Sequence, residues 1–234
     1  MTIKFSIAIV FLLLAQANSY GQNVADEYTI ENTWGINKST SSGLIGGVIF
    51  KHSVRNSKNS FTSYGLELIN VKHPAEQKIV AGTGNSFTLS KTNRLFAIRG
   101  QYGREYLLFK KAPQQGIQIN LILTVGPSIG LESPYYIVYD QTSRVPYDPS
   151  IHNIEKISDH AFFLQGVFQS NIVIGANVKT ALSFEFGSQK SSVSGFEAGF
   201  LLDAYTRKIN MISEAENYAV WPTAFITLFY GSRK

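Results

Sequence analysis

Several side chains of this chain could carry out acid–base chemistry, and their spacing decides which of them could act together. The run "KHS" at Lys51–Ser53 has the residue types of a hydrolase pair, in which a histidine activates a serine. His52 and Ser53 are neighbours in a segment that has the pattern of a strand, so we expect them to point to opposite faces of the sheet. The pair is therefore not predicted to be catalytic.

A second candidate is the polar run "YDPSIHNIEKISDH", which holds acids and histidines of the kind that bind divalent metals. Its candidate ligands are Asp148, His152, Glu155, Asp159 and His160. Their spacing fits no known ligand pattern. The glycines of "AGTGNSF" at 81–87 lack the Lys-Ser/Thr pair of a phosphate loop. The sequence predicts no metal site and no cofactor.

Charged residues also occur singly inside segments that otherwise alternate between apolar and small polar residues. In "NIVIGANVKTALSFEF", the alternate positions from Ile172 to Phe186 are apolar apart from Thr180, and Lys179 and Glu185 fall between them. A period of two is typical of a β-strand with one apolar face. The environment of this strand must therefore accept charges on its second face.

Eight segments of the chain alternate in this way. They span approximately residues 27–37, 43–55, 60–72, 92–109, 116–131, 171–187, 192–206 and 217–231. Strands in soluble sheets have a modal length of about five or six residues, and these segments are roughly twice as long. A strand that crosses a bilayer at a tilt needs about 9–11 residues.

The composition separates a soluble sandwich from a membrane barrel. Charged residues make up 16% of the chain, compared with about 25% in soluble proteins. The polar parity of the segments holds mostly Gly, Ser, Thr and Asn, which suits a crowded interior better than a solvated surface. The sequence predicts an all-β fold, an eight-stranded antiparallel transmembrane β-barrel with its apolar face towards lipid.

The connections between the segments alternate in length. Short turns are expected near 56–59, 110–115 and 187–191, and the longest connection spans 132–170. Short periplasmic turns and long extracellular loops are typical of outer-membrane barrels. We therefore expect one long extracellular loop, 132–170. Its apolar part is expected to be covered, either as a lid over the barrel mouth or by another protein, and comprises Phe162, Phe163, Leu164, Val167 and Phe168.

The N-terminus has the layout of a cleaved secretory signal peptide. Lys4 precedes an apolar run, and small and polar residues follow up to Gly21. We assign 1–21 to the signal peptide and 22–234 to the barrel. Together with the strand pattern, this predicts export to the outer membrane of a Gram-negative bacterium.

The charges on the inward parity are predicted to plug the barrel. Buried charges persist when they are paired, and eight strands enclose about enough space for side chains to fill. We call this set the interior ion-pair network. It comprises Glu31, Lys51, Glu67, Arg99, Glu105, Lys179, Glu185, Glu197 and Asp203.

The short turns and the C-terminal tail carry cations without acids. This predicted periplasmic basic rim comprises Arg55, Lys58, Lys110, Lys111, Lys190, Arg233 and Lys234. Such a rim could bind anionic lipid headgroups or an acidic partner. The expected partners are outer-membrane lipid and other outer-membrane or periplasmic proteins. Nucleic acid is not expected, because the cations are thinly spread.

The C-terminal segment "PTAFITLFYGSRK" resembles the recognition strand of bacterial outer-membrane proteins, although four residues follow Tyr230. With "SYGLELINVKHP" and "KAPQQGIQIN", it is similar to an uncharacterised family of small outer-membrane β-barrel proteins of Bacteroidota, with an architecture like the OmpA barrel. The resemblance implies a fold and a location, and no activity.

These observations predict an integral outer-membrane β-barrel protein that is not an enzyme. Its expected role is structural, or that of an accessory subunit in a larger outer-membrane assembly. Two alternatives stay open. One is a lipid-modifying enzyme at the barrel mouth, which needs convergent polar groups in a cavity. The other is a small-solute channel, which needs a continuous aqueous lumen.

Overall fold

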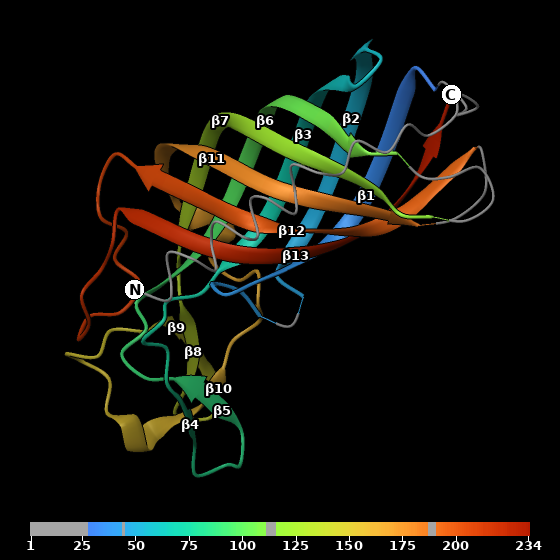
Figure 1. Cartoon of the computed structure of the whole chain (residues 1–234). Helices are drawn as coiled ribbons and strands as arrows, with labels where there is room; N and C mark the ends of the chain where they lie inside the picture. Colours follow the sequence, from blue (N-terminus) through green and yellow to red (C-terminus); the bar gives the residue numbers. More distant parts are fainter. Residues whose placement is uncertain (1–27, 44, 111–115, 187–190) are drawn as a thin grey trace, which may run out of the picture.

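The computed structural model describes residues 28–43, 45–110, 116–186 and 191–234. Eight strands form a closed barrel in the order β1-β13-β12-β11-β7-β6-β3-β2, and every neighbouring pair is antiparallel (Figure 1). The predicted all-β, eight-stranded antiparallel barrel is confirmed. The predicted signal peptide, 1–21, lies outside the described residues.

The barrel strands agree with the predicted segments to within a few residues at each end. They are β1 (Ile30–Ser39), β2 (Gly47–Ser57), β3 (Ser60–Val71), β6 (Asn93–Phe109), β7 (Gln118–Pro134), β11 (Asn171–Phe186), β12 (Ser192–Tyr205) and β13 (Val220–Arg233). Each closes the ring by hydrogen bonds to two neighbours, which leaves no free barrel edge.

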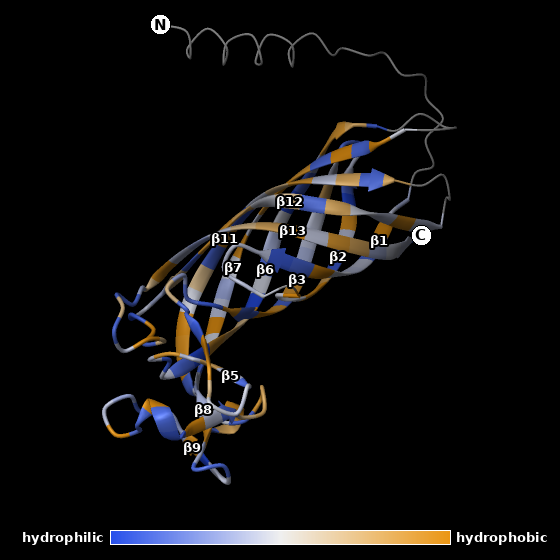
Figure 2. Cartoon of the chain, turned by 90° about the horizontal axis from the view of Figure 1, so that it is seen from below, coloured by the Kyte–Doolittle hydropathy of each residue, from blue (hydrophilic) through white to orange (hydrophobic). Residues whose placement is uncertain are grey.

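The two faces of each barrel strand differ in polarity, as Figure 2 shows by the alternating colours along the strands. On β11, Ile174 and Val178 are exposed on the outer wall, whereas Asn177, Lys179 and Glu185 are buried inside. On β13, Ile226, Leu228 and Tyr230 are likewise exposed. The barrel therefore has the opposite polarity to a soluble sandwich, whose apolar face is inside.

The long connections lie at one end of the barrel and fold into a small second layer (Figure 1). We call residues 72–92 and 135–170 the head. In it, β4 (Lys78–Val80) pairs with β5 (Ser86–Thr88), and β8 (Tyr136–Tyr139) lies between β9 (Ser143–Pro146) and β10 (Ile157–His160).

The head has a hydrophobic core of its own, which includes Phe87, Tyr135, Ile137, Tyr147 and Ile157. Its two 3-10 helices are η1 (Ile154–Lys156) and η2 (Val167–Gln169). Within the described residues, no helix is long and apolar enough to span a membrane. The core holds the head together as a folded unit.

The apolar part of the 132–170 loop does not close the barrel mouth. Phe162, Leu164 and Phe168 are exposed, and Phe168 is wholly so. The Phe163 ring packs edge-on against Phe96, with 5.3 Å between the ring centroids. Phe96 belongs to the outward parity of β6, so this segment lies beside the outer wall. Of the two arrangements expected for this apolar segment, the chain does not form the lid, because it leaves Phe162, Leu164 and Phe168 uncovered. Cover by another protein stays a prediction.

Candidate functional site in the barrel interior

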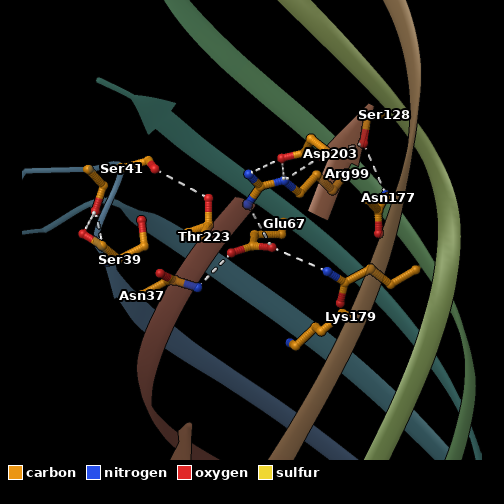
Figure 3. Close-up of polar contacts among 12 residues, drawn as sticks. Asn37, Ser39, Ser41, Glu67, Arg99, Ser128, Asn177, Lys179, Asp203 and Thr223 are labelled. Carbon is orange, nitrogen blue, oxygen red and sulfur yellow. Dashed lines mark hydrogen bonds and ion pairs between the residues drawn. The ribbon is translucent and has the colours of Figure 1, made fainter. Parts of the chain in front are cut away.

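Arg99 on β6 is the centre of the polar contacts at the loop-rich half of the interior (Figure 3). Its guanidinium contacts Asp203 on β12 at 2.5 Å and Glu67 on β3 at 3.2 Å. Asn37 donates a hydrogen bond of 2.7 Å to Glu67, and Ser128 donates one of 2.9 Å to Asp203. Both carboxylates are thus paired with a cation and bonded to a neutral donor, the condition under which buried charges are tolerated.

A second ion pair lies nearer the short-turn end. The ammonium of Lys51 on β2 is 3.0 Å from the carboxylate of Glu105 on β6. Ser53 donates a hydrogen bond of 2.7 Å to the same carboxylate. Both members of the pair are buried, so this part of the interior is filled by side chains.

The two interior charges of β11, Lys179 and Glu185, have different partners. Lys179 on β11 contacts Glu197 on β12 at 2.5 Å, and its ammonium lies 4.8 Å from the centre of the Phe225 ring. Glu185 accepts a hydrogen bond of 2.5 Å from Asn120 on β7. Every residue of the predicted interior ion-pair network is buried.

Arg233 belongs to this interior and not to the basic rim. Its Nε donates to Glu31 at 2.6 Å, and its Nη2 donates to Glu185. The side chain is buried and its guanidinium lies 4.1 Å from the centre of the Tyr28 ring. The assignment of Arg233 to the rim is therefore wrong. β13 pairs with β1 as far as Arg233 and Glu31, and this pairing places the side chain opposite its acids.

The other rim residues lie at the short-turn end. Lys58, Lys110 and Lys234 are exposed. Arg55 donates a hydrogen bond of 2.7 Å to the carbonyl of Tyr28 and lies over the rings of Tyr28 and Phe61. The predicted members Lys111 and Lys190 lie outside the described residues.

The barrel mouth is capped by the loop between β12 and β13. We call residues 206–219 the cap loop. Its Ile209, Met211 and Ile212 are buried in one cluster with inward residues of the barrel, including Leu95 and Trp221. Sequence analysis did not single out this loop. The apolar run "INMI" at 209–212 in an otherwise polar connection was the available signal.

The remaining candidates do not converge on a catalytic arrangement. Ser53 points inside to Glu105, whereas His52 lies on the other face with its Nδ1 2.6 Å from Asn32 Oδ1, so the two do not meet. Within the described residues, no group of three or more His, Cys, Asp or Glu side chains could hold a metal ion.

Comparisons with known proteins give distant structural likenesses. The chain matches no family model and no curated protein. It is similar to the attachment invasion locus protein Ail of Yersinia pestis, solved with the heparin analogue sucrose octasulfate, at 9% identity over 89% of this chain and 99% of Ail, with a TM-score of 0.43. It is also similar to Neisserial surface protein A, at 12% identity over 88% of this chain and 97% of that chain, with a TM-score of 0.41.

Proposed function

We propose that this chain is an integral protein of the outer membrane of a Gram-negative bacterium, exported with a signal peptide at 1–21. The observation that carries the proposal is the polarity of the barrel. Apolar side chains such as Trp34, Phe50, Val178 and Leu228 are exposed on its outer wall, whereas the residues of the interior ion-pair network are buried inside. A wall of exposed apolar side chains is unfavourable in water, whereas contact with the acyl chains of a lipid bilayer is favourable for it.

We further propose that the protein is not an enzyme and acts as a structural or accessory subunit of a larger outer-membrane assembly. The interior carboxylates are engaged in ion pairs, so they are poor candidates for acid–base work. The cap loop and the ion pairs also oppose passage of solutes, which disfavours the channel alternative. The folded head would supply the surface for a partner.

The membrane placement is tested by alkaline carbonate extraction of cells that express the full chain. We expect the protein to stay with the membrane, and N-terminal sequencing of the mature protein to begin at Gln22. Release of the protein into the soluble fraction would refute the placement.

The closed interior and the accessory role need separate measurements. In planar bilayers the purified protein should give little conductance, whereas large, stable single-channel steps would favour the channel alternative. Purification in mild detergent from native membranes should recover a defined outer-membrane or periplasmic partner at constant ratio. Recovery of the chain alone under all mild conditions would argue for a free-standing structural role.

A further inference from the structure

A cavity of about 150 Å³ lies where the head meets strands β3 and β6. Four of the described residues that line it are cationic and one is a carboxylate. They are Lys72, Lys78, Lys91 and Arg94, with Glu76 as the acid. A water molecule takes about 30 Å³ of liquid, so the cavity has room for several waters or for one tetrahedral anion.

Two of the cations are built into the wall of this cavity. Arg94 is 7% exposed, lies 4.9 Å from the centre of the Tyr135 ring, and donates a hydrogen bond of 2.5 Å to the carbonyl of Phe163. Lys91 is 6% exposed and forms a salt bridge with Glu76. Both side chains are therefore fixed by their neighbours, which lowers the entropy lost when a ligand binds.

Lys72 and Lys78 are the other two cations of the cavity. Within the part of the chain that the structure describes, neither Lys72 nor Lys78 forms a salt bridge. Burial lowers the pKa of Lys91, even though Glu76 opposes the shift. The cavity thus has an excess of positive charge that a bound anion would relieve.

The cavity lies against the outer wall of the barrel, at the loop-rich end of the apolar surface of that wall. Along β3, the outward side chains Leu66 and Leu68 are exposed and apolar, and Asn70 and Lys72 follow on the same parity. Leu68 pairs with Ile98 of β6, and Asn70 pairs with Phe96. The next outward residue of β6 is Arg94. The outer wall therefore changes from apolar to cationic over one step of the alternation on β6, from Phe96 to Arg94, and over two steps on β3, from Leu68 through Asn70 to Lys72.

This change marks the level at which lipid headgroups would lie. Acyl chains would contact Leu66, Leu68 and Ile98, and an anionic headgroup would lie beside Lys72 and Arg94. The aromatic ring of Phe163 packs on Phe96 between these two levels, and aromatic side chains are typical of the membrane interface.

We propose that this cavity binds the phosphate group of an anionic membrane lipid, held by Lys72, Lys78, Lys91 and Arg94. This inference rests on the membrane placement proposed above. Lysine and arginine are the side chains that bind phosphate by charge-assisted hydrogen bonds. The site is at the loop-rich end of the barrel, opposite to the predicted basic rim.

The experiment measures binding of a phosphorylated glycolipid to the purified full chain in a nonionic detergent, by native mass spectrometry and by titration. The probes are a lipid A with two phosphates, the same lipid after dephosphorylation, and inorganic phosphate. The main variant is Lys72→Gln with Lys78→Gln, because among the described residues these lysines have no salt bridge to lose. Arg144→Gln with Lys156→Gln removes the same charge from exposed positions of the head that do not line the cavity.

We expect the wild type and the Arg144/Lys156 control to bind the phosphorylated lipid equally, and the Lys72/Lys78 variant to bind it at least about tenfold more weakly. Raising the salt concentration should narrow this difference. Dephosphorylated lipid should bind weakly because it lacks the phosphate, and inorganic phosphate should bind weakly because it lacks the acyl chains. Equal binding by the Lys72/Lys78 variant, or by dephosphorylated lipid, would overturn the proposal.

Two further outcomes separate this inference from the membrane placement. Inorganic phosphate that binds as tightly as the lipid would overturn the assignment to lipid. The Lys72/Lys78 variant should stay in the membrane after carbonate extraction, so a loss of lipid binding alone reports on the cavity. Release of the wild type from the membrane refutes the placement instead.

Discussion

Arg99 and Asp203 stand on strands β6 and β12, which are not neighbours in the barrel, and their side chains meet across its interior. The Nε of Arg99 lies 3.0 Å from Oδ2 and 3.1 Å from Oδ1 of Asp203. Strands β11 and β7 separate the two in the ring. The pair therefore ties opposite parts of the wall together through the interior.

Removal of Arg99 should destabilise the barrel strongly. Arg99→Met would leave Glu67 and Asp203 buried without their cation, which typically costs about 3–5 kcal/mol of unfolding free energy. Urea unfolding of the protein in lipid vesicles measures the change. Arg144→Met, at an exposed position of the head, is the matched control and should change stability by about 0.5 kcal/mol or less. Equal stability of Arg99→Met and wild type would show that the ion pairs do not hold the wall.

A lysine introduced on the outer wall of the barrel should destabilise the protein, whereas a lysine introduced in the head should not. Val178 on β11 is 55% exposed and Val80 in the head is 74% exposed, so the same substitution can be made at both. Val178→Lys should lower the unfolding free energy in lipid vesicles by about 2–4 kcal/mol, as expected for lysine near the middle of a bilayer. Val80→Lys should have little effect, because this side chain faces water. Similar small effects at both positions would contradict contact of β11 with lipid.

The cap loop should open when its buried residue Met211 is replaced by alanine. Met211 is fully buried in the mouth cluster, and Met→Ala in a packed core costs about 2–5 kcal/mol. We expect Met211→Ala to speed tryptic cleavage at the exposed Arg207 and Lys208 while the barrel stays folded, because only the loop opens. Ile154→Ala, on the exposed helix η1 of the head, serves as control. A cleavage rate unchanged by Met211→Ala would show that the loop is held by other contacts.

The sequence predicted the barrel well because its signal is local. Alternation along β11 gives the strand, its two faces and the inward position of Lys179 without reference to any other segment. The hydrophobic cluster at the mouth is different. Ile209, Met211 and Ile212 are buried because they pack against residues such as Leu95 and Trp221. These partners are distant in the sequence, so the pattern of the loop alone does not predict the contact.

Arg233 shows a second limit of prediction from the sequence. As one of the last two residues of a basic tail it was assigned to an exposed rim, yet its register with Glu31 turns it inwards. That register is set by the pairing of the last barrel strand, β13, with the first, β1. It therefore depends on two segments that are far apart in the sequence. The exposed segment around Phe168 is a third case, because the sequence showed that it is apolar and could not show on which side of the wall it lies.

The orientation of the barrel can be tested by protease sites at its two ends. The turn before Ser143 joins β8 to β9, and its residues 141–142 are exposed, so a cleavage sequence inserted there should be tolerated. If the loop-rich end faces outwards, protease added to intact cells should cut this site. A cleavage sequence appended after Lys234, at the opposite end, should be cut after the outer membrane is permeabilised and not before. Each tagged protein is first checked for retention in the membrane after carbonate extraction. The reverse pattern of cleavage would place the head and its basic cavity in the periplasm, and the lipid bound there would then belong to the inner leaflet.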